Sequence, residues 1–408
     1  MFFDRKVVDD MFKVTDRMNN VHSDIRGPLY QEAMRMRAQG IDVLRLNTGN
    51  PGTFGFGMPD SVRDALLSQA DKAVAYCDSQ GMPEARQAIL EYHRGKGFQN
   101  IELKDIFIGN GVSELVQMVA LATLNPGDEI LVPTPNYSLW SNSAYLAGAR
   151  PVYYRCDEQQ HWFPDAKDIE SKITNRTRAI LLINPNNPTG VLYSREAVLD
   201  ILEIARKNNL LVFSDEIYDR LVMDGKVHHS SAALAPDLNV VTFNGLSKSH
   251  IICGFRCGWM VLSGPGIAEI RDAMERLSSM RLCGNALTQL VIPAALADNE
   301  STQAMLRPGG RIYEQRRACV EVIQQSDGIT CEVNDAAFYL FPKFDNKRFN
   351  ITDDRDFGMG LLKSKHVLVI PGSGFGYPEP NHFRIVMLPQ PEELRKATQD
   401  MVDFLHGK

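Results

Sequence analysis

The sequence predicts an α/β protein with two parts: a large domain built on a mostly parallel central sheet with helices on both faces, and a smaller α+β domain. Two observations lead to this prediction. Short apolar runs alternate with helical patterns through the middle of the chain, which indicates strands joined by helical crossovers. After about residue 290 the pattern changes, and long helical segments precede a few short strand-like pieces.

The elements are predicted in chain order as follows. The first 45 residues are mostly helical in pattern and amphipathic, and we expect them to fold onto the smaller domain or onto a partner subunit. The domain boundaries that follow are an N-terminal segment over residues 1–48 that packs with the small domain, a large domain over 49–290 and a small domain over 291–408.

The central strands are predicted from runs rich in Val, Ile and Leu that do not alternate with polar residues, as in strands covered on both faces. Helical spacing of apolar residues marks the helices at 196–209 and 309–325, and strand-like pieces of the small domain lie at 336–344 and 382–388. The predicted strands of the central sheet are 129–135, 178–185, 210–218, 240–245 and 257–263.

Composition and charge exclude several classes of protein. The chain has 408 residues, of which 44% are apolar and 23% charged, as in an ordinary globular protein. Its formal net charge of −6 predicts neither a nucleic-acid partner nor an anionic membrane partner. No apolar run approaches the roughly 18 residues of a membrane helix, and the acidic residues near the N-terminus do not fit a secretory signal.

The cysteines indicate a reducing compartment. Their number, seven, is odd and they are scattered, so we expect reduced thiols and a cytoplasmic protein. Cys253 and Cys257 are four residues apart, but no second Cys or His pair completes a ligand set, and no metal site is predicted.

A loop of seven residues, Asn184-Pro-Asn-Asn-Pro-Thr-Gly190, directly follows the apolar run RAILLI. Two prolines remove backbone donors and stiffen the loop, so that its asparagines become fixed hydrogen-bonding groups. Ligands gather at the carboxyl ends of strands in open α/β sheets. An ordinary Asn- and Pro-rich turn is the alternative interpretation.

Asp215 ends the apolar run LLVFSD, and Tyr218 follows three residues later. An acid at the end of a buried strand is costly unless it is paired or hydrogen-bonded. It could cap a helix or form a structural ion pair. The functional interpretation is a carboxylate that holds a cationic ring nitrogen.

Lys248 stands just beyond the apolar run VVTFNG, 33 residues after Asp215 and so one strand–helix–strand unit later. This spacing predicts that both residues lie at the ends of nearby strands. Lys248 could be a solvated loop residue. In a partly desolvated, cation-rich site its amine would instead be a nucleophile for carbonyl groups.

The segment IGNGVSELVQMVALATL, residues 108–124, is typical of a strand end, a glycine loop and a helix. Gly109 and Gly111 let the backbone approach a ligand, and the free N–H groups of the first helical turn favour an anion. Arg256 adds a fixed cation suited to a phosphate. A glycine loop alone is weak support, but together with Lys248 and Arg256 it predicts a phosphate site.

One cofactor satisfies these features together. Pyridoxal 5′-phosphate (PLP) needs a lysine for its aldehyde and an acid for its ring nitrogen, and it needs an anion site for its phosphate. We therefore predict PLP as the cofactor.

The chain resembles the class I aminotransferases of PLP fold type I over essentially its whole length. The residues that carry the resemblance are NPNNPTG (184–190), SDEIY (214–218), GLSK (245–248), GFRCGW (254–259) and FRIV (383–386). Within the family it is most similar to the bacterial glutamate–pyruvate (alanine) aminotransferases, through IRGPLYQEAMRMRAQG, LNTGNP, YCDSQGMPEAR and GNGVSELV.

The resemblance implies roles for single residues. Lys248 would bond covalently to the cofactor, Asp215 would pair with its ring nitrogen, and Lys248, Asp215 and Tyr218 would be the catalytic residues. Tyr218 and Asn187 would hydrogen-bond the ring oxygen, and Tyr137 would stack on the ring. The residues implied for the phosphate are Gly111, Val112, Ser247, Arg256 and, from a neighbouring subunit, Tyr76.

The resemblance also implies how substrates are bound. Arg384 would hold the substrate α-carboxylate, with Gly49 and Asn187 nearby, and Arg26 would meet the distal carboxylate of glutamate. Because Tyr76 would serve the neighbouring subunit, the implied assembly is a homodimer with shared active sites.

Two features depart from the family pattern. The segment Ser249–Cys253 reads Ser-His-Ile-Ile-Cys, so His250 and Ile251 replace a small polar, aromatic and basic sequence. Gly245 stands where some relatives have Ser, which removes one hydroxyl from the phosphate site.

The expected activity is PLP-dependent transamination between an L-amino acid and a 2-oxo acid, with alanine and 2-oxoglutarate giving pyruvate and glutamate. The alternatives are an aminotransferase specific for aspartate, aromatic or branched-chain amino acids, and a PLP-dependent C–S β-lyase. A PLP-binding regulator would carry a basic DNA-binding region, which the acidic charge argues against. A purely structural α/β protein would show no cofactor absorbance.

Overall fold

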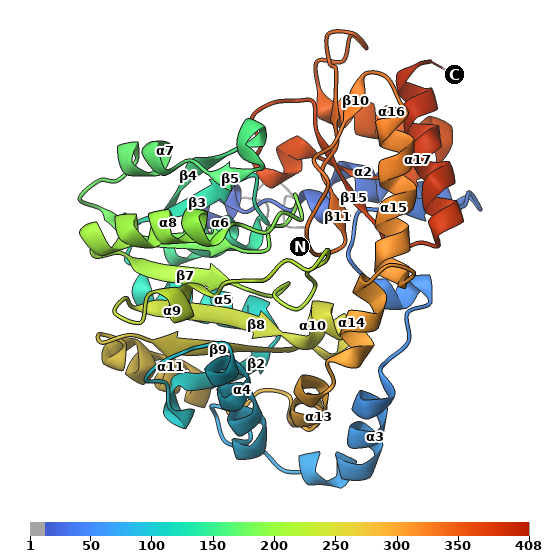
Figure 1. The fold of residues 1–408 in the computed structure, drawn as a ribbon. Coiled ribbons are helices and arrows are strands. Elements are labelled where there is room, and N and C mark those ends of the chain that lie inside the picture. Colours follow the sequence, from blue (N-terminus) through green and yellow to red (C-terminus); the bar gives the residue numbers. More distant parts are fainter. Residues whose placement is uncertain (1–12, 408) are drawn as a thin grey trace, which may run out of the picture.

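A computed structural model describes residues 13–407 of the chain. Its centre is an eight-stranded sheet with the spatial order β2-β9-β8-β7-β6-β3-β4-β5 (Figure 1). The expected α/β architecture, with a mostly parallel sheet between helices, is confirmed. In this spatial order the strands are β2 (Ile106–Asn110), β9 (Cys257–Ser263), β8 (Val240–Gly245), β7 (Leu211–Asp215), β6 (Thr177–Ile183), β3 (Glu129–Thr134), β4 (Arg150–Asp157) and β5 (Phe163–Pro164).

Strands β8, β7, β6, β3 and β4 are parallel, whereas β9 runs antiparallel to both of its neighbours, β2 and β8. The sequence predicted a mostly parallel sheet and assigned no direction to the strand at 257–263. Residues 246–256, which join β8 to β9, are fewer than the roughly dozen that a parallel crossover needs. The chain therefore turns back along β8.

Alternate side chains of each central strand point to opposite faces of the sheet. On β6, Ile180 and Leu182 pack on one face, and Leu181 and Ile183 pack on the other. This explains why the runs are apolar throughout rather than alternating. The strand around Asp215 ends at that residue, not at 218, because Asp219 N donates to Glu216 O and turns the chain.

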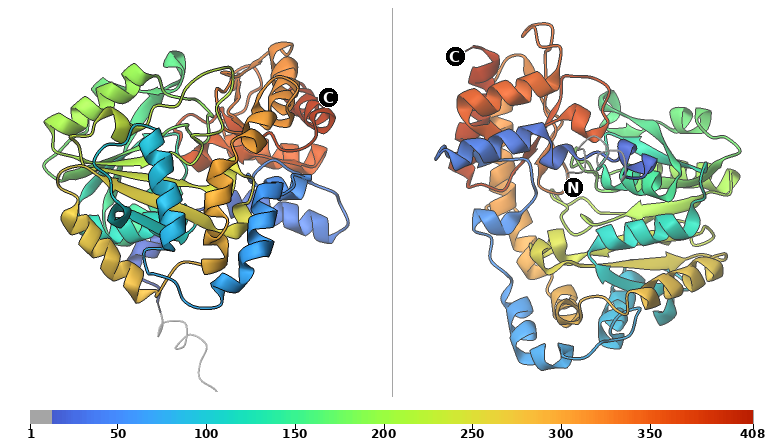
Figure 2. Two further views of the ribbon diagram at one scale, coloured as in Figure 1. Left: turned by 60° about the horizontal axis from the view of Figure 1, so that its bottom comes forward. Right: turned by 180° about the vertical axis from the view of Figure 1, so that it is seen from behind.

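Helices cover both faces. Figure 1 shows α4 and α8 on the near face, and Figure 2 shows α5 and α11 covering the opposite face. The helices of this region are α3 (Asp60–Gln69), α4 (Pro83–Gly95), α5 (Val112–Thr123), α6 (Leu139–Ala147), α7 (Ala166–Ser171), α8 (Arg195–Lys207), α9 (Ser231–Leu234), α10 (Leu246–Ser249), α11 (Ala268–Met280), α12 (Ala286–Gln289), α13 (Ile292–Ala297) and α14 (Glu300–Leu306).

The C-terminal part has its own apolar core, formed by three helices and short strands. The helices are α15 (Arg311–Gln324), α16 (Asp354–Lys365) and α17 (Pro391–Leu405). The strands are β10 (Ile329–Thr330), β11 (Tyr339–Leu340), β12 (Lys343–Phe344), β13 (Val367–Leu368), β14 (Ile370–Pro371) and β15 (Phe383–Val386), with β11-β15-β14 forming one sheet.

The N-terminal residues contact this C-terminal part. Strand β1 (Leu44–Arg45) pairs in parallel with β13, and α2 (Pro28–Ala38) packs against α16, as Figure 2 shows from behind. The prediction of helical structure over residues 1–12 lies outside the described residues. The domain boundaries after residues 48 and 290 stay predictions. Within residues 13–407, no helix has both the length and the apolar character needed to cross a membrane.

Candidate active site

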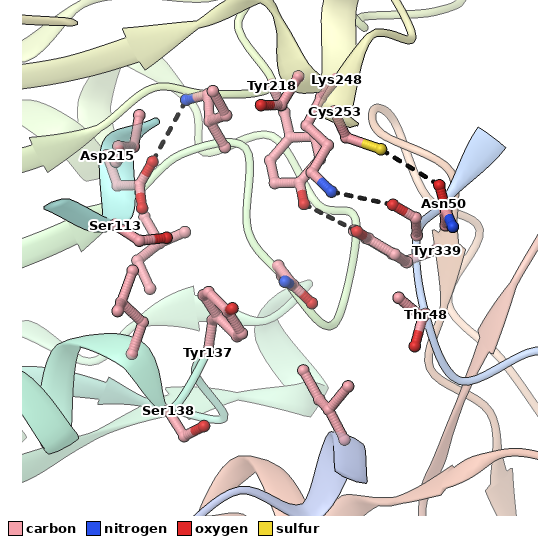
Figure 3. Close-up of a pocket in the computed structure, with 18 of the residues that line it drawn as sticks. Thr48, Asn50, Ser113, Tyr137, Ser138, Asp215, Tyr218, Lys248, Cys253 and Tyr339 are labelled. Carbon is pink, nitrogen blue, oxygen red and sulfur yellow. Dashed lines mark hydrogen bonds between the residues drawn. The ribbon is translucent and has the colours of Figure 1, made fainter. Parts of the chain in front are cut away.

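A pocket of about 720 Å³ opens where the carboxyl ends of β6 and β7 face β15 and residues 48–50. Its size is that of a site for a small ligand. Figure 3 shows Asp215 and Ser113 on one side and Lys248, Tyr218 and Tyr339 on the other. The predicted site residues that line it are Arg26, Gly49, Val112, Tyr137, Asn187, Asp215, Tyr218, Ser247, Lys248, Arg256 and Arg384.

Two predicted site residues do not line this pocket. Gly111 lies immediately beside it, at the start of α5 and against the guanidinium of Arg256. Tyr76 is 79% exposed and lies away from the pocket of its own chain.

Lys248 reaches the pocket from α10, the single helical turn that follows β8. Its Nζ donates to Gly49 O at 3.1 Å and lies 5.9 Å from the centre of the Phe338 ring. The amine therefore points across the pocket toward residues 48–50, as Figure 3 shows.

Asp215 is buried at the end of β7. Its Oδ2 accepts a hydrogen bond from Trp140 Nε1 at 2.9 Å, and its Oδ1 accepts one from Ile217 N at 3.3 Å. Burial raises the pKa of Asp215 to about 6, against the opposing effects of these hydrogen bonds and of the Lys248 charge. Such a carboxylate gains most from a cation brought into the pocket.

An anion site forms where α5 begins. Gly111 has φ of 85°, and an added Cβ would lie within contact of the Arg256 guanidinium, so only glycine fits. Arg256 is held in place by its bond from Nη1 to Cys253 O at 3.0 Å. Val112, Ser113 and Ser247 line the pocket beside it. The N–H groups of the first turn of α5 and the guanidinium together favour a phosphate.

Arg384 lies on β15 at the other end of the pocket and is buried. Its Nη1 donates to Asn187 Oδ1 at 2.9 Å, and its guanidinium packs 4.7 Å from the centre of the Tyr339 ring. Burial lowers its pKa from the usual range. Because Asn187 accepts with its oxygen, its amide NH₂ is the group that can donate into the pocket.

Three tyrosines complete the walls. Tyr218 and Tyr339 join their hydroxyl groups at 2.8 Å, and burial raises the pKa of Tyr218 well above its usual value. Tyr137 follows β3, and burial raises its pKa as well. The hydroxyl groups of Tyr218 and Tyr137 are therefore neutral near pH 7 and can donate hydrogen bonds.

Comparison with known proteins decides the family. The family model described as aminotransferase class I and II matches residues 41–400. The glutamate–pyruvate aminotransferases of Haemophilus influenzae and Escherichia coli are each 46% identical to this chain, covering 97% and 96% of it and 98% of each relative.

The chain belongs to the class I and II aminotransferases.

Solved structures agree with this assignment. The crystal structure of an aminotransferase from Escherichia coli has a TM-score of 0.95 and 46% identity, with 97% of this chain and 98% of that chain covered. The alanine aminotransferase from Pyrococcus furiosus has a TM-score of 0.90 and 35% identity, with 97% and 100% covered.

Trp140, Tyr339 and Cys253 are among the residues around this aminotransferase's pocket that sequence reasoning missed as site residues. Trp140 was not singled out, although it lies three residues after Tyr137 and bonds Asp215 from α6. Tyr339 and Cys253 also line the pocket. Cys253 Sγ bonds Asn50 Oδ1 at 3.3 Å. Only the spacing of Trp140 from Tyr137 offered a signal, since the other contacts join distant segments.

The departures at residues 249–253 lie mostly behind the pocket of this aminotransferase. His250 is buried, with its Nε2 at 2.6 Å from Ala295 O in α13 and its Nδ1 at 2.9 Å from Ser249 Oγ. Ile251 is buried as well, and only Cys253 of this segment lines the pocket.

Proposed function

We propose that this aminotransferase binds PLP and transfers the amino group between alanine and 2-oxoglutarate, giving pyruvate and glutamate. The observation that carries the proposal is the convergence of Lys248, Asp215 and Arg256 in one pocket. These three groups match the aldehyde, the ring nitrogen and the phosphate of the cofactor.

The residues of the pocket fit the cofactor. The raised pKa of Asp215, which burial causes, leaves a carboxylate in need of a cationic partner such as a protonated ring nitrogen. At the opposite end, Gly111 leaves space beside the Arg256 guanidinium that a larger residue would fill. When bound, PLP supplies an electron-withdrawing ring that stabilises negative charge at the substrate Cα.

The other pocket residues are proposed to bind and orient the cofactor. Asp215 holds a proton on the ring nitrogen, and Tyr218 and Asn187 donate hydrogen bonds to the ring oxygen. Tyr137 stacks on the ring, while Val112 and Ser247 join Arg256 at the phosphate. Lys248 would hold the cofactor through its amine, and the same amine would be the base that takes the proton from the substrate Cα.

Arg384 is proposed to hold the substrate α-carboxylate. It is a buried guanidinium, and Asn187 and Tyr339 fix its orientation. A bidentate pair with a carboxylate suits this residue. Gly49 lies beside Lys248, where a side chain would meet Tyr339 and Phe338, so the substrate passes close to the backbone there.

Arg26 is proposed to bind the distal carboxylate of glutamate and 2-oxoglutarate. It is exposed and lines the pocket from the N-terminal segment. This segment is anchored to α6, because His22 N donates to Asn142 Oδ1 at 3.2 Å and Asn142 Nδ2 donates to His22 O at 2.6 Å. A cation at the pocket mouth can recognise a second carboxylate without hindering smaller substrates.

The choice of alanine is supported by the relatives. Besides the two glutamate–pyruvate aminotransferases, the alanine aminotransferase of Mycobacterium bovis is 41% identical, with 97% of this chain and 92% of the relative covered. The test is a panel of amino acids, each mixed with the PLP-loaded protein and followed by the loss of cofactor absorbance. We expect alanine and glutamate to react fastest, and preference for another pair would overturn the assignment.

Other activities on the same fold are separated by simple assays. The aspartate aminotransferase of a Bacillus species is 32% identical, so aspartate belongs in the panel, together with aromatic and branched-chain amino acids. A C–S β-lyase would release pyruvate and ammonia from cysteine conjugates without a 2-oxo acid. We expect turnover only when an oxo acid is supplied.

We further propose a homodimer in which Tyr76 reaches the phosphate of the partner's cofactor. The apolar side chains of Tyr76, Val74, Leu282 and Leu287 are all exposed, and residues 70–73 contact α12, which carries Leu287. Gln289 Nε2 bonds Cys77 Sγ at 3.4 Å and so joins the two segments. An exposed apolar patch of this kind marks an interaction site. Sedimentation should give twice the chain mass of 45.7 kDa, and a monomer would refute the dimer.

The cytoplasm is the proposed location. All seven cysteines lie within the described residues and carry free thiols, which supports a reducing compartment. Fractionation of the source cells should recover the protein with seven titratable thiols in the cytoplasmic fraction.

A further inference from the structure

Behind the pocket lies a cluster of charged residues that the proposed reaction does not use. Lys96 follows the last turn of α4, and its side chain is 18% exposed. Its Nζ lies 2.6 Å from Asp219 Oδ2 and 3.4 Å from Glu216 Oε2, and both carboxylates are only 1% exposed. One ammonium thus neutralises two carboxylates that have left water.

The two carboxylates alternate with two proposed site residues. Glu216 directly follows Asp215, and Asp219 directly follows Tyr218, within the turn closed by Asp219 N donating to Glu216 O. Glu216 Oε1 also accepts from Ser214 Oγ at 2.9 Å and from Ser230 Oγ at 2.7 Å. The contacts of Glu216 therefore restrain the backbone next to Asp215, and the contacts of Asp219 restrain the backbone next to Tyr218.

Lys96 also reaches the loop that carries Asn187. Its Nζ lies 3.3 Å from His228 Nδ1, and His228 Nε2 lies 3.1 Å from Asn184 O. An ammonium only donates, so Nδ1 accepts and the Nε2–H donates to the carbonyl of Asn184. Burial, followed by the charge of Lys96, lowers the pKa of His228 to about 4, which keeps this tautomer neutral.

The charges reinforce the arrangement. Burial alone would lower the pKa of Lys96, but Asp219 and Glu216 raise it. Burial alone would raise the pKa of Glu216, but Lys96 lowers it. Tyr92 Oη, one turn earlier on α4, donates to the same Asp219 Oδ2 at 2.5 Å. In Figure 1, α4 lies on the same face of the sheet as α9, which follows the His228 loop.

We propose that Lys96 is a positioning residue for transamination: through Glu216, Asp219 and His228 it holds Asp215, Tyr218 and Asn187 in register around the cofactor. This inference rests on the proposed function. A buried cation with two carboxylates is costly to disrupt, because removing it leaves both anions unpaired. Lys96 itself does not line the pocket.

The test compares Lys96→Met with two other variants. His228→Phe removes the bond to Asn184 and the contact of the imidazole with Lys96, but it leaves both carboxylate contacts of Lys96 in place. Lys172→Met removes an outlying pair to Asp168. Amide hydrogen exchange is measured on the full-length proteins with and without PLP. In Lys96→Met, exchange should rise about tenfold or more in residues 184–190 and 215–221 but not in α17. His228→Phe should raise it only in 184–190, and Lys172→Met in neither segment.

Kinetics give a second readout. We expect Lys96→Met to weaken PLP binding and lower kcat at least tenfold at saturating PLP, with the wild-type protein as reference. Unchanged exchange in both loops, or a uniform rise that includes α17, would overturn the proposal. Should Lys96→Met fail to fold, His228→Phe decides by the same criterion for residues 184–190. A wild-type protein that does not bind PLP would refute the proposed function, while exchange in the cofactor-free proteins still tests Lys96.

Discussion

At the scale of single residues, the pocket depends on Asp215, whose pKa is raised by burial. Asp215 is held by Trp140 and the backbone of Ile217, with no cationic partner in direct contact among the described residues. Its properties in the cofactor-free protein can therefore be measured without any assay of turnover.

The pH dependence of stability should identify Asp215. Burial raises its pKa to about 6 in the folded protein, whereas the unfolded value is about 3.9. Its contribution to stability is therefore complete below about pH 4 and is lost as the pH rises through 6, which amounts to about 3 kcal/mol. Urea unfolding of the cofactor-free protein should show Asp215→Asn gaining that much relative to wild type between pH 4 and 8. A difference independent of pH would contradict the expected titration.

Trp140 should set part of that pKa. Its indole N–H donates to Asp215 Oδ2 and favours the charged carboxylate. Trp140→Phe removes a hydrogen bond to a charge, worth about 1.5 kcal/mol, and should raise the pKa of Asp215 by about one unit. Trp259→Phe is the matched control, because Trp259 bonds His93 elsewhere in the core. In the same series of urea unfolding at different pH values, the stability of Trp140→Phe should fall at a higher pH than that of Trp259→Phe. If both variants lose stability around the same pH, the role of Trp140 is refuted.

At the scale of elements, the turn between β2 and α5 forms the proposed phosphate site. Gly111 and Gly127 have φ of 85° and 89°, so alanine is strained at both. Only at Gly111 would the new Cβ meet Arg256. Both Gly→Ala variants should lose about 1–2 kcal/mol of stability, but Gly111→Ala alone should weaken PLP binding tenfold or more. Binding titrations that give equal losses for both variants would contradict the assignment of this turn.

Many of the central strands could be predicted from the sequence. Buried strands such as 240–245 and 257–263 are rich in apolar residues that do not alternate regularly with polar ones, and the structure begins and ends both at the predicted residues. Strand β4 was missed, because Arg150 and Arg155 interrupt its apolar pattern. Strands of two residues, such as β13, are too short to leave any periodicity, and they exist because distant segments pair.

The sequence also predicted which residues of the site lie at strand ends, but not the contacts between residues that are far apart in the chain. Lys248 and Asn187 follow predicted strands and Asp215 ends the apolar run of another, and strand ends meet at one edge of a parallel sheet. Contacts such as Arg384 with Asn187 join residues 197 positions apart. Nothing in the residues alone reports those contacts, and the resemblance to a family supplied the role expected of Arg384.

At the scale of the whole molecule, the proposed dimer makes each site depend on two chains. Tyr76 is 79% exposed and away from the pocket of its own chain. Mixed dimers of Lys248→Ala with Tyr76→Ala should contain one pocket that carries both defects and one that carries neither. Refolding the two weak variants together should therefore restore activity toward half of wild type per dimer.

The control for complementation is the mixture of Lys248→Ala with Asp215→Ala. Both residues line the same pocket, so no mixed dimer has an intact site and no activity should return. Failure of the Tyr76 mixture to recover activity, with mixed dimers demonstrated by mass, would refute shared sites.

The covalent bond between Lys248 and PLP is the most direct test of the proposed function. The PLP-loaded protein is reduced with borohydride, digested and sequenced by mass spectrometry. We expect the cofactor mass on the peptide that contains Lys248, and we expect Lys248→Ala to lose both this label and the visible absorbance while Lys172→Met keeps them. A label on another lysine, or an unlabelled protein after incubation with excess PLP, would contradict the proposed chemistry.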